Sequence, residues 1–471
     1  MKKYILISII FIFVGCSGNL EDLNVDEKNA TSAPAETFFN YALKNMSNLE
    51  SDLTYGANGS PYTLSRLWSQ QISSVTYNEG TTYYSNFNWT NVYLEVLINL
   101  QESRKVIEST VQTPMNAVAL KNKLSILEIL RVYSYSKLVE SFGNIPYSEA
   151  LDVNNISPTY DDAETIYLDL LSDLNTALDN IDESGASWND DLMYDGNTEL
   201  WKKFGRSLQL LMAMRIVDSN PQVAETNIIA ALPGVFTSNA DNATVEHLDA
   251  QPNTTALYLD LAVGNRKDFV GAKPFIDYMN SLEDPRRSVF FKSVNGDYIG
   301  AESGMVVNYD SYSEMGTLFY QPNTAVIFID YSTVEFLLAE AAERNIAGVA
   351  DAELHYNNAI KASFEYYGVS GVDDYLAQPE VAYSTAPGNW KEKIGMQKWV
   401  ALYNQGLEAW TEYRRLDYPK LSAPAGAYVD TVPVRLIYPI SEQTLNRSNY
   451  EAAAADIGGD LLTTKLFWDK Y

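Results

Sequence analysis

Cysteine and histidine are almost missing from this chain of 471 residues, which holds one cysteine, Cys16, and two histidines, His247 and His355. A single cysteine permits no disulfide within the chain, so packing must stabilise the fold. The sequence also lacks a His-Glu-x-x-His metal motif, a phosphate-binding loop and a Gly-x-Ser-x-Gly nucleophile motif. We therefore expect no catalytic residues, no resident metal and no cofactor.

Positive charge is also scarce, since 33 lysines and arginines face 61 aspartates and glutamates, for a net charge of −28. Such an acidic chain is repelled by nucleic acid and by anionic lipid surfaces. We therefore exclude nucleic acid as a partner. Apolar residues make up 46% of the chain, which is enough for a packed core and argues against disorder.

Long hydrophobic runs are limited to the N-terminus. Lys2 and Lys3 precede an apolar run over residues 4–14, and Gly15 then leads into Cys16. This run is shorter than the roughly 17–25 residues of a membrane span and is typical of a secretory signal. We predict a signal peptide at residues 1–15 and a lipid on Cys16; the alternative is an ordinary secreted protein whose cysteine falls there by chance. Residues 16–36 are polar and read as a tether, followed by a single domain over residues 37–471.

Amphipathic periodicity predicts a mostly α-helical fold. Apolar residues recur at helical spacing in residues 119–142, 161–181, 198–217, 331–344, 351–367 and 390–416. The 331–344 and 351–367 helices, separated by a short turn with Gly348, resemble a tetratricopeptide helix pair. We place helical pairs within residues 37–218, 330–370 and 390–418. Residues 219–329 and 419–471 read as a loop-rich, partly β ligand-binding region with short strands at 326–329 and 434–438.

Aromatic residues are abundant, with 33 tyrosines, 17 phenylalanines and 8 tryptophans. Tyrosine and tryptophan join a flat apolar face to a polar group, which suits both sugar rings and peptides. Between Trp68 and Tyr93 they alternate with amide side chains, which pair with neutral polar ligands, and a second cluster spans residues 312–320. The candidate ligand-binding residues are Trp68, Tyr77, Tyr83, Tyr84, Trp89, Tyr312 and Tyr320. The alternative is that many of these rings pack in the core.

One stretch resembles part of a calcium loop, with Asp191, Asp195 and Gly196 in an Asp-x-x-x-Asp-Gly pattern. Met193 occupies a position where a calcium ligand is required, and Lys202 stands where the loop needs a glutamate. We therefore interpret this stretch as a turn.

Several motifs together resemble the SusD/RagB-like family of nutrient-binding outer-membrane lipoproteins of the Bacteroidota. In chain order they are the helix ending at Phe142-Gly143-Asn144-Ile145-Pro146, the helix begun by Trp201, the turn Asp284-Pro285-Arg286, the helix from Val334 to Ala341, the later helix that carries Trp399 and Trp410, and the C-terminal segment from Arg435 to Tyr450. Gly205-Arg206 replaces the usual Ala-Asn. The tryptophans of these motifs lie on apolar helix faces, where core packing is favoured over ligand contact.

The resemblance implies four tetratricopeptide-like helix pairs and a function. Such a protein sits on the outer membrane by its lipid, faces the cell exterior, and captures an oligosaccharide or oligopeptide. It then delivers the nutrient to a TonB-dependent, SusC-like barrel transporter, over which it acts as a lid. Two alternatives remain open: a surface hydrolase of glycans or peptides, which needs only two carboxylates in the glycan case, and a tetratricopeptide-type adaptor that binds only proteins.

Overall fold

The computed structural model describes residues 33–54, 59–84 and 88–471. The predicted signal peptide, Cys16 and most of the predicted tether lie outside these residues. The last two residues assigned to the tether belong to a helix, because α1 begins at Ala35. Residues Ala35–Tyr471 form one compact unit. Within the described residues, no helix combines the length and the apolar character that crossing a membrane requires.

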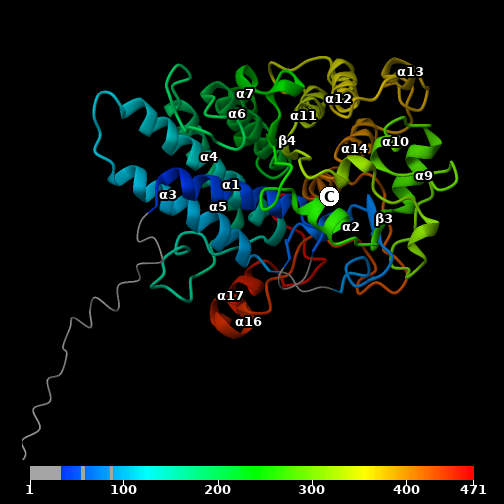
Figure 1. Ribbon diagram of the computed structural model, residues 1–471, viewed down its shortest axis with the longest axis horizontal. Coiled ribbons are helices and arrows are strands. Elements are labelled where there is room, and N and C mark those ends of the chain that lie inside the picture. Colours follow the sequence, from blue (N-terminus) through cyan, green and yellow to red (C-terminus); the bar gives the residue numbers. More distant parts are fainter. Residues whose placement is uncertain (1–32, 55–58, 85–87) are drawn as a thin grey trace, which may run out of the picture. The chain divides into compact units, whose positions relative to one another are not determined.

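Helices dominate the first half of this unit, as the periodicity predicted. They are α1 (Ala35–Ser51), α2 (Thr63–Trp68), α3 (Ile98–Ser109), α4 (Ala117–Phe142), α5 (Ala163–Asn180), α6 (Thr198–Arg215) and α7 (Pro221–Ala231), with a π-helical stretch η1 (Val92–Leu97) before α3. α1 packs on α3, α4 on α5, and α6 on α7 (Figure 1). Asp162 caps α5 and Asn197 caps α6, each accepting a backbone N–H three residues further on. Helix α7 falls in the span expected to be loop-rich.

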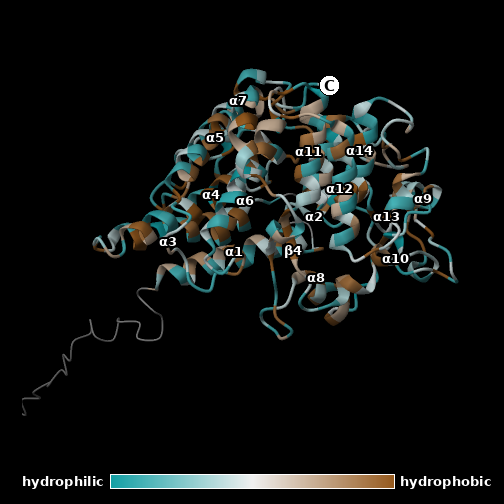
Figure 2. Cartoon of the chain, turned by 90° about the horizontal axis from the view of Figure 1, so that it is seen from above, coloured by the Kyte–Doolittle hydropathy of each residue, from teal (hydrophilic) through white to brown (hydrophobic). Residues whose placement is uncertain are grey.

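A second helical group follows in the last third of the chain. It contains α11 (Tyr331–Glu343), α12 (Ala352–Tyr366), α13 (Val372–Leu376), α14 (Trp390–Ala401) and α15 (Gly406–Leu416). The predicted helix pair at residues 331–367 is confirmed as α11 and α12, which pack against each other. Along the helices of both groups, hydrophobic and hydrophilic segments alternate (Figure 2), as expected for helices that bury one face.

The single helix predicted over residues 390–416 is wrong, because the chain breaks between α14 and α15. Asn404 adopts the left-handed conformation, with φ at +66°. Gly406 begins α15 directly against α2, where a Cβ atom would lie 2.8 Å from the Cα of Arg66. This close approach requires glycine, and the turn lets α15 pack on α2 instead of continuing the line of α14.

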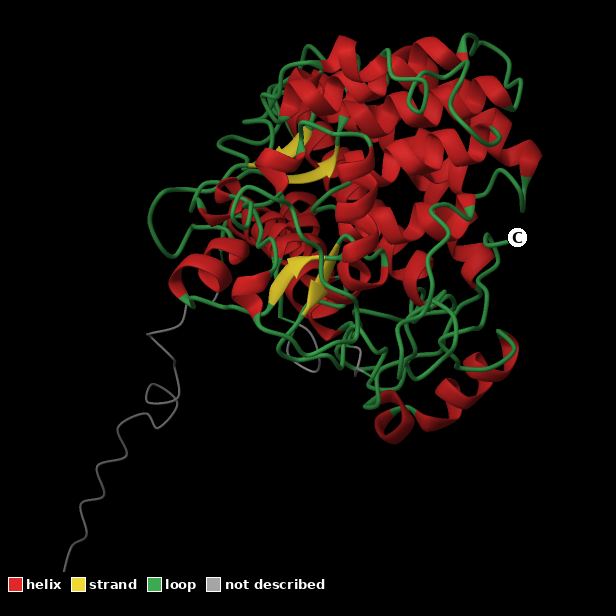
Figure 3. Cartoon of the chain, turned by 90° about the vertical axis from the view of Figure 1, so that its right-hand side faces the viewer, coloured by secondary structure: helices red, strands yellow, loops and turns green. Residues whose placement is uncertain are grey.

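The strands are few and short (Figure 3). β1 (Ile72–Ser74) pairs antiparallel with β3 (Phe269–Gly271), and β2 (Ala243–Val245) pairs antiparallel with β4 (Val326–Ile329). The strand expected at residues 326–329 is therefore confirmed as β4. Residues 434–438 form a loop rather than the expected strand. The remaining helices of the loop-rich parts are α8 (Ala256–Tyr258), α9 (Lys273–Ser281), α10 (Arg287–Phe290), α16 (Glu442–Leu445) and α17 (Arg447–Asp456).

The motif tryptophans are core residues, as predicted. Trp201, Trp399 and Trp410 are all buried, and each indole N–H donates to an acceptor inside the fold. The Asp284-Pro285-Arg286 turn carries a salt bridge, with Nη2 of Arg286 2.6 Å from Oδ2 of Asp284.

A buried ionic network joins the two helical groups. Its centre is Arg215 on α6, which pairs with Glu408 and Glu412 on α15. The network extends through Lys137 on α4, which pairs with Glu408, and Lys398 on α14, which pairs with Glu412. Further links are Glu140, Glu340 and Arg415. Buried charges must be paired to be tolerated, so this network fixes how α4, α6, α14 and α15 meet.

Candidate ligand-binding surface

Two of the predicted ligand-binding residues, Trp68 and Tyr83, lie in the core. Trp68 is fully buried, its indole N–H donates to the carbonyl of Gly80 at 3.0 Å, and its ring meets the edge of Trp410. Tyr83 is also buried and stands edge-on to Trp68, with ring centroids 6.0 Å apart. Neither ring is accessible to a ligand in solution. They instead support the loop that carries the exposed tyrosines next to them.

Tyr77 and Tyr84, from the same cluster, point to solvent and are 58% and 54% exposed. The loop between them is ordered by its own hydrogen bonds, since the N–H of Tyr84 donates to the carbonyl of Glu79 at 2.8 Å. Rings held exposed on an ordered loop give up little conformational freedom when they bind a ligand.

A third tyrosine, Tyr428, packs against Tyr84 from the C-terminal loop region. It is 63% exposed, and its ring lies 5.0 Å from that of Tyr84 at an interplanar angle of 63°. The pairing is fixed by the backbone, because the N–H of Tyr428 donates to the carbonyl of Thr82 at 2.9 Å. Sequence reasoning missed Tyr428, which stands alone among small and polar residues far along the chain.

A further loop, around Gly304, completes the arrangement. The side-chain amide of Asn78 donates to the carbonyl of Gly304 at 3.0 Å, and the N–H of Val307 donates to the carbonyl of Val75. Gly304 has φ at +83°, and a Cβ atom there would lie 2.9 Å from Cβ of Pro424. Glycine is therefore required where the three loops meet. Met305 and Val306 on this loop are exposed.

We call these five exposed side chains the tyrosine surface: Tyr77, Tyr84, Met305, Val306 and Tyr428. They come from three loops that hydrogen bonds hold together. Large exposed apolar side chains gathered on neighbouring loops mark an interaction site. Two more predicted residues, Tyr312 and Tyr320, are half-buried. Tyr312 packs against a small cluster that contains Val75, and the hydroxyl of Tyr320 donates to Glu314 at 3.0 Å.

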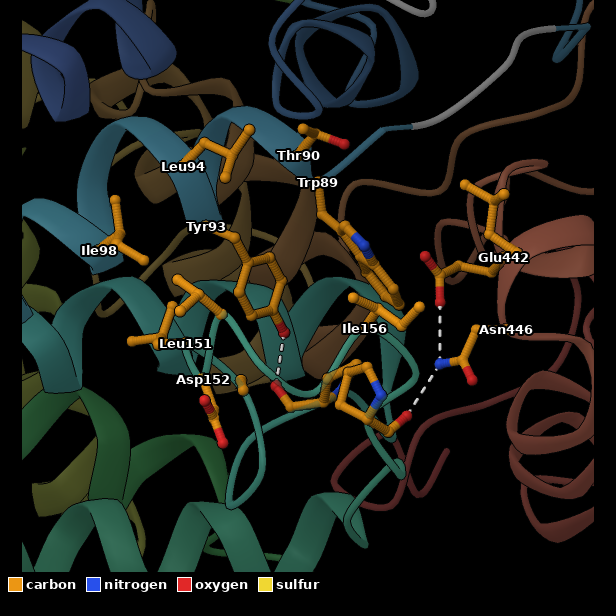
Figure 4. Close-up of a pocket in the computed structure, with 15 residues that line it drawn as sticks. Trp89, Thr90, Tyr93, Leu94, Ile98, Leu151, Asp152, Ile156, Glu442 and Asn446 are labelled. Atoms are coloured by element: carbon orange, nitrogen blue, oxygen red, sulfur yellow. Dashed lines mark hydrogen bonds between the residues drawn. The ribbon is translucent and has the colours of Figure 1, made fainter. Parts of the chain in front are cut away.

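Trp89 lines a different opening, which we call the Trp89 pocket (Figure 4). This pocket has a volume of about 350 Å³ and lies between η1, α3, the loop over residues 146–158 and α16. Trp89 itself is 5% exposed and packs edge-on against Phe142. The aromatic cluster predicted as one site therefore divides between two places, the tyrosine surface and this pocket.

The two histidines have structural partners. Nε2 of His247 lies 2.7 Å from Oγ of Ser47, and burial lowers the pKa of this imidazole. Nδ1 of His355 on α12 lies 2.7 Å from Oε2 of Glu335 on α11. Both histidines therefore tie elements of the fold together.

The calcium-like stretch is a turn closed by its first aspartate. The carboxylate of Asp191 accepts the backbone N–H groups of Met193, Tyr194 and Gly196 and the indole N–H of Trp201. These four donors occupy both oxygens. Over the part of the chain that the structure describes, no group of three or more His, Cys, Asp or Glu side chains is arranged to hold a metal ion.

The chain matches one protein-family model over residues 27–439, that of the SusD-like family described as starch-binding and associating with the outer membrane. Many solved structures share its fold. One titled a chitin-binding protein is 27% identical with a TM-score of 0.77, covering 93% of this chain and 100% of its own. A SusD homolog from Bacteroides uniformis is 26% identical with a TM-score of 0.76, covering 92% and 100%.

A further solved structure, a chitin-binding SusD homolog from Flavobacterium johnsoniae, is 23% identical with a TM-score of 0.75, which shows a shared fold. It covers 93% of this chain and 98% of its own. No curated protein sequence matches the chain. The family model spans most of the sequence, and the observed helices agree with the fold that the motifs implied. The chain belongs to the SusD-like family.

Proposed function

We propose that this protein captures a neutral oligosaccharide on the tyrosine surface and delivers it to a TonB-dependent barrel transporter in the outer membrane. The observation that carries the proposal is that Tyr77, Tyr84 and Tyr428 stand exposed on two joined loops, with the rings of Tyr84 and Tyr428 in contact. Each of the three rings is more than half exposed. Flat aromatic faces stack on the apolar faces of sugar rings, and their hydroxyls bond the sugar's polar groups.

Two observations favour a neutral glycan as the ligand. The family is described as starch-binding, and a relative with 27% identity is titled a chitin-binding protein. The net charge of −28 disfavours anionic polymers. Neutral glycans built from glucose or N-acetylglucosamine are therefore the class to test first.

Capture rather than catalysis is the proposed role. Relatives are described by what they bind. The two histidines contact structural partners, and Asp191 closes a turn. We therefore assign the tyrosine surface a role in stacking on the ligand, without a catalytic acid or nucleophile.

Anchoring and delivery complete the proposal. The signal peptide at residues 1–15 and the lipid on Cys16 would hold the protein at the membrane, since two or more acyl chains anchor stably. The family's association with the outer membrane supports this location. The barrel transporter, over which the protein would act as a lid, remains part of the proposal.

The test is a calorimetric titration of the purified protein against neutral malto- and chito-oligosaccharides, with a mixed oligopeptide panel in parallel. Chromatography of each mixture after the titration would show whether any ligand has been cleaved. Binding of one glycan series without product is the expected result. Binding of peptides alone, or release of shorter sugars, would contradict the proposal.

A further inference from the structure

The Trp89 pocket differs in chemistry from the tyrosine surface. Its lining is mainly apolar. It includes the rings of Trp89 and Tyr93, with Ile156 near Trp89 (Figure 4), and also Leu445. Ile156 and Leu445 are 87% and 75% exposed. A volume of about 350 Å³ is enough for one large apolar side chain with its neighbours.

The polar groups of the pocket are mostly committed to the protein. The hydroxyl of Tyr93 donates to the carbonyl of Pro146 at 2.6 Å, and the amide of Asn446 donates to the carbonyl of Pro158 at 2.8 Å. These bonds appear as dashed lines in Figure 4. A sugar needs several free donors and acceptors around its ring, so this lining fits a glycan poorly.

The charge of the lining has one sign. Asp152 and Glu442 contribute carboxylates from opposite walls, and the described residues that line the pocket include no lysine, arginine or histidine. Asp152 is exposed, whereas Glu442 is half-buried and accepts the hydroxyl of Tyr160 at 2.8 Å. Two carboxylates beside aromatic faces attract a cation, both by charge and through the ring faces.

We propose that the Trp89 pocket binds a basic amphipathic peptide segment of a partner protein. A large apolar side chain of that segment would enter between Trp89 and Ile156. A neighbouring lysine or arginine would lie against Asp152 or Glu442. The proposal is independent of glycan capture, because it uses none of the residues of the tyrosine surface.

The test measures binding of three short blocked peptides, each with a fluorescent label, by anisotropy with the purified protein. One carries adjacent Leu and Lys, the second has Ser in place of Leu, and the third has Glu in place of Lys. The Leu-Lys peptide is expected to bind at least about tenfold more tightly than either of the others. Its affinity should fall with rising salt. Equal binding of all three peptides would overturn the proposal.

Variants of the pocket residues test whether the peptide binds in the Trp89 pocket. The pair Asp152→Asn and Glu442→Gln should weaken the Leu-Lys peptide roughly threefold to tenfold, and Gln at 442 still accepts from Tyr160. The pair Ile156→Ser and Leu445→Ser removes exposed apolar walls without opening the core. Matched controls are Asp374→Asn and Met115→Ser, which are exposed elsewhere.

The control variants should bind like the wild type, and a glycan bound at the tyrosine surface should leave peptide binding unchanged. Unchanged peptide affinity in both pocket variants, or displacement of the peptide by glycan, would refute the assignment.

Discussion

The ring of Tyr84 stands against the ring of Tyr428 with centroids 5.0 Å apart, although 343 residues separate the two in the chain. The backbone bond from Tyr428 to Thr82 fixes this contact. Two exposed rings that support each other in this way present a surface that is formed before any ligand arrives. Preorganisation of this kind raises affinity because little conformational freedom is lost on binding.

The first prediction separates stacking from hydrogen bonding at Tyr84 and Tyr428. If the rings stack on sugar, Tyr84→Phe and Tyr428→Phe should keep glycan affinity within about twofold, whereas each alanine variant should lose about 0.5–1.5 kcal/mol of binding free energy. Calorimetry measures the glycan affinity of the phenylalanine and alanine variants. Phenylalanine variants as weak as the alanine variants would show that the hydroxyls, not the ring faces, hold the ligand.

The second prediction concerns Gly304, where the three loops meet. Gly304→Ala places a Cβ atom 2.9 Å from Cβ of Pro424 at a φ of +83°. The free energy of unfolding should fall by about 1–2 kcal/mol from the left-handed backbone alone, and the displaced loop should also weaken glycan binding.

Gly296→Ala is the matched control for this change. Gly296 has φ at +102°, and nothing lies within 4 Å of its would-be Cβ. This variant should lose stability from backbone strain but keep full glycan affinity. If both glycine variants bind equally well, the meeting of the loops at Gly304 does not position the site.

The third prediction concerns the buried pair of Glu408 and Arg215. Glu408→Gln leaves Arg215 and Lys137 with fewer negative partners inside the core. Removing one member of a buried ion pair destabilises a fold by about 3–5 kcal/mol. Urea unfolding at neutral pH should show this loss, and Glu183→Gln, at an exposed pair with Lys202, should change stability by less than about 1 kcal/mol.

The same pair predicts how stability depends on pH. Burial alone would raise the pKa of Glu408, but Arg215 and Lys137 outweigh it and lower the pKa to about 2. A carboxylate whose pKa is lower in the folded state stabilises the fold above its unfolded pKa and loses that contribution as the pH falls through its folded pKa. Wild-type stability should therefore drop between about pH 4.5 and pH 2, and the drop should be smaller in Glu408→Gln. Parallel acid profiles for the two proteins would contradict this assignment.

The fourth prediction concerns Asp191, whose carboxylate accepts four hydrogen bonds. Asp191→Ala leaves these donors unpaired and should reduce the free energy of unfolding by about 2–4 kcal/mol. Thermal unfolding with and without calcium is the measurement. A rise in the wild-type melting temperature on adding calcium that is absent in Asp191→Ala would show that this turn is a metal site instead.

Periodicity was enough to predict α4, α5, α6, α11 and α12, because a helix that buries one face repeats its apolar residues at helical spacing. Helix α4 was expected at residues 119–142 and spans Ala117–Phe142. The break between α14 and α15 was missed because it depends on Gly406 meeting Arg66, a contact between segments far apart in the chain. The hydrophobic periodicity of one segment does not predict a contact with a distant segment.

The candidate site was predicted only in part, for a similar reason. Trp68, Tyr77, Tyr83 and Tyr84 share one short aromatic stretch, but tertiary packing buries Trp68 and Tyr83 and leaves the other two exposed. The composition shows that this stretch is rich in aromatic rings. It does not show which rings are buried in the core and which are exposed on the surface. Tyr428 carries no local signal, since its place beside Tyr84 is set by a backbone bond across the fold.

Binding of a neutral glycan on the tyrosine surface can be tested directly. Its most direct test is a calorimetric titration of the best-binding oligosaccharide into the wild type and into the Tyr77→Ala, Tyr84→Ala, Tyr428→Ala triple variant. Tyr471→Ala, an equally exposed tyrosine elsewhere, serves as the control. The triple variant should fold normally and lose glycan binding, whereas the control should keep it. A triple variant that binds as tightly as the wild type would show that the glycan does not bind on the tyrosine surface.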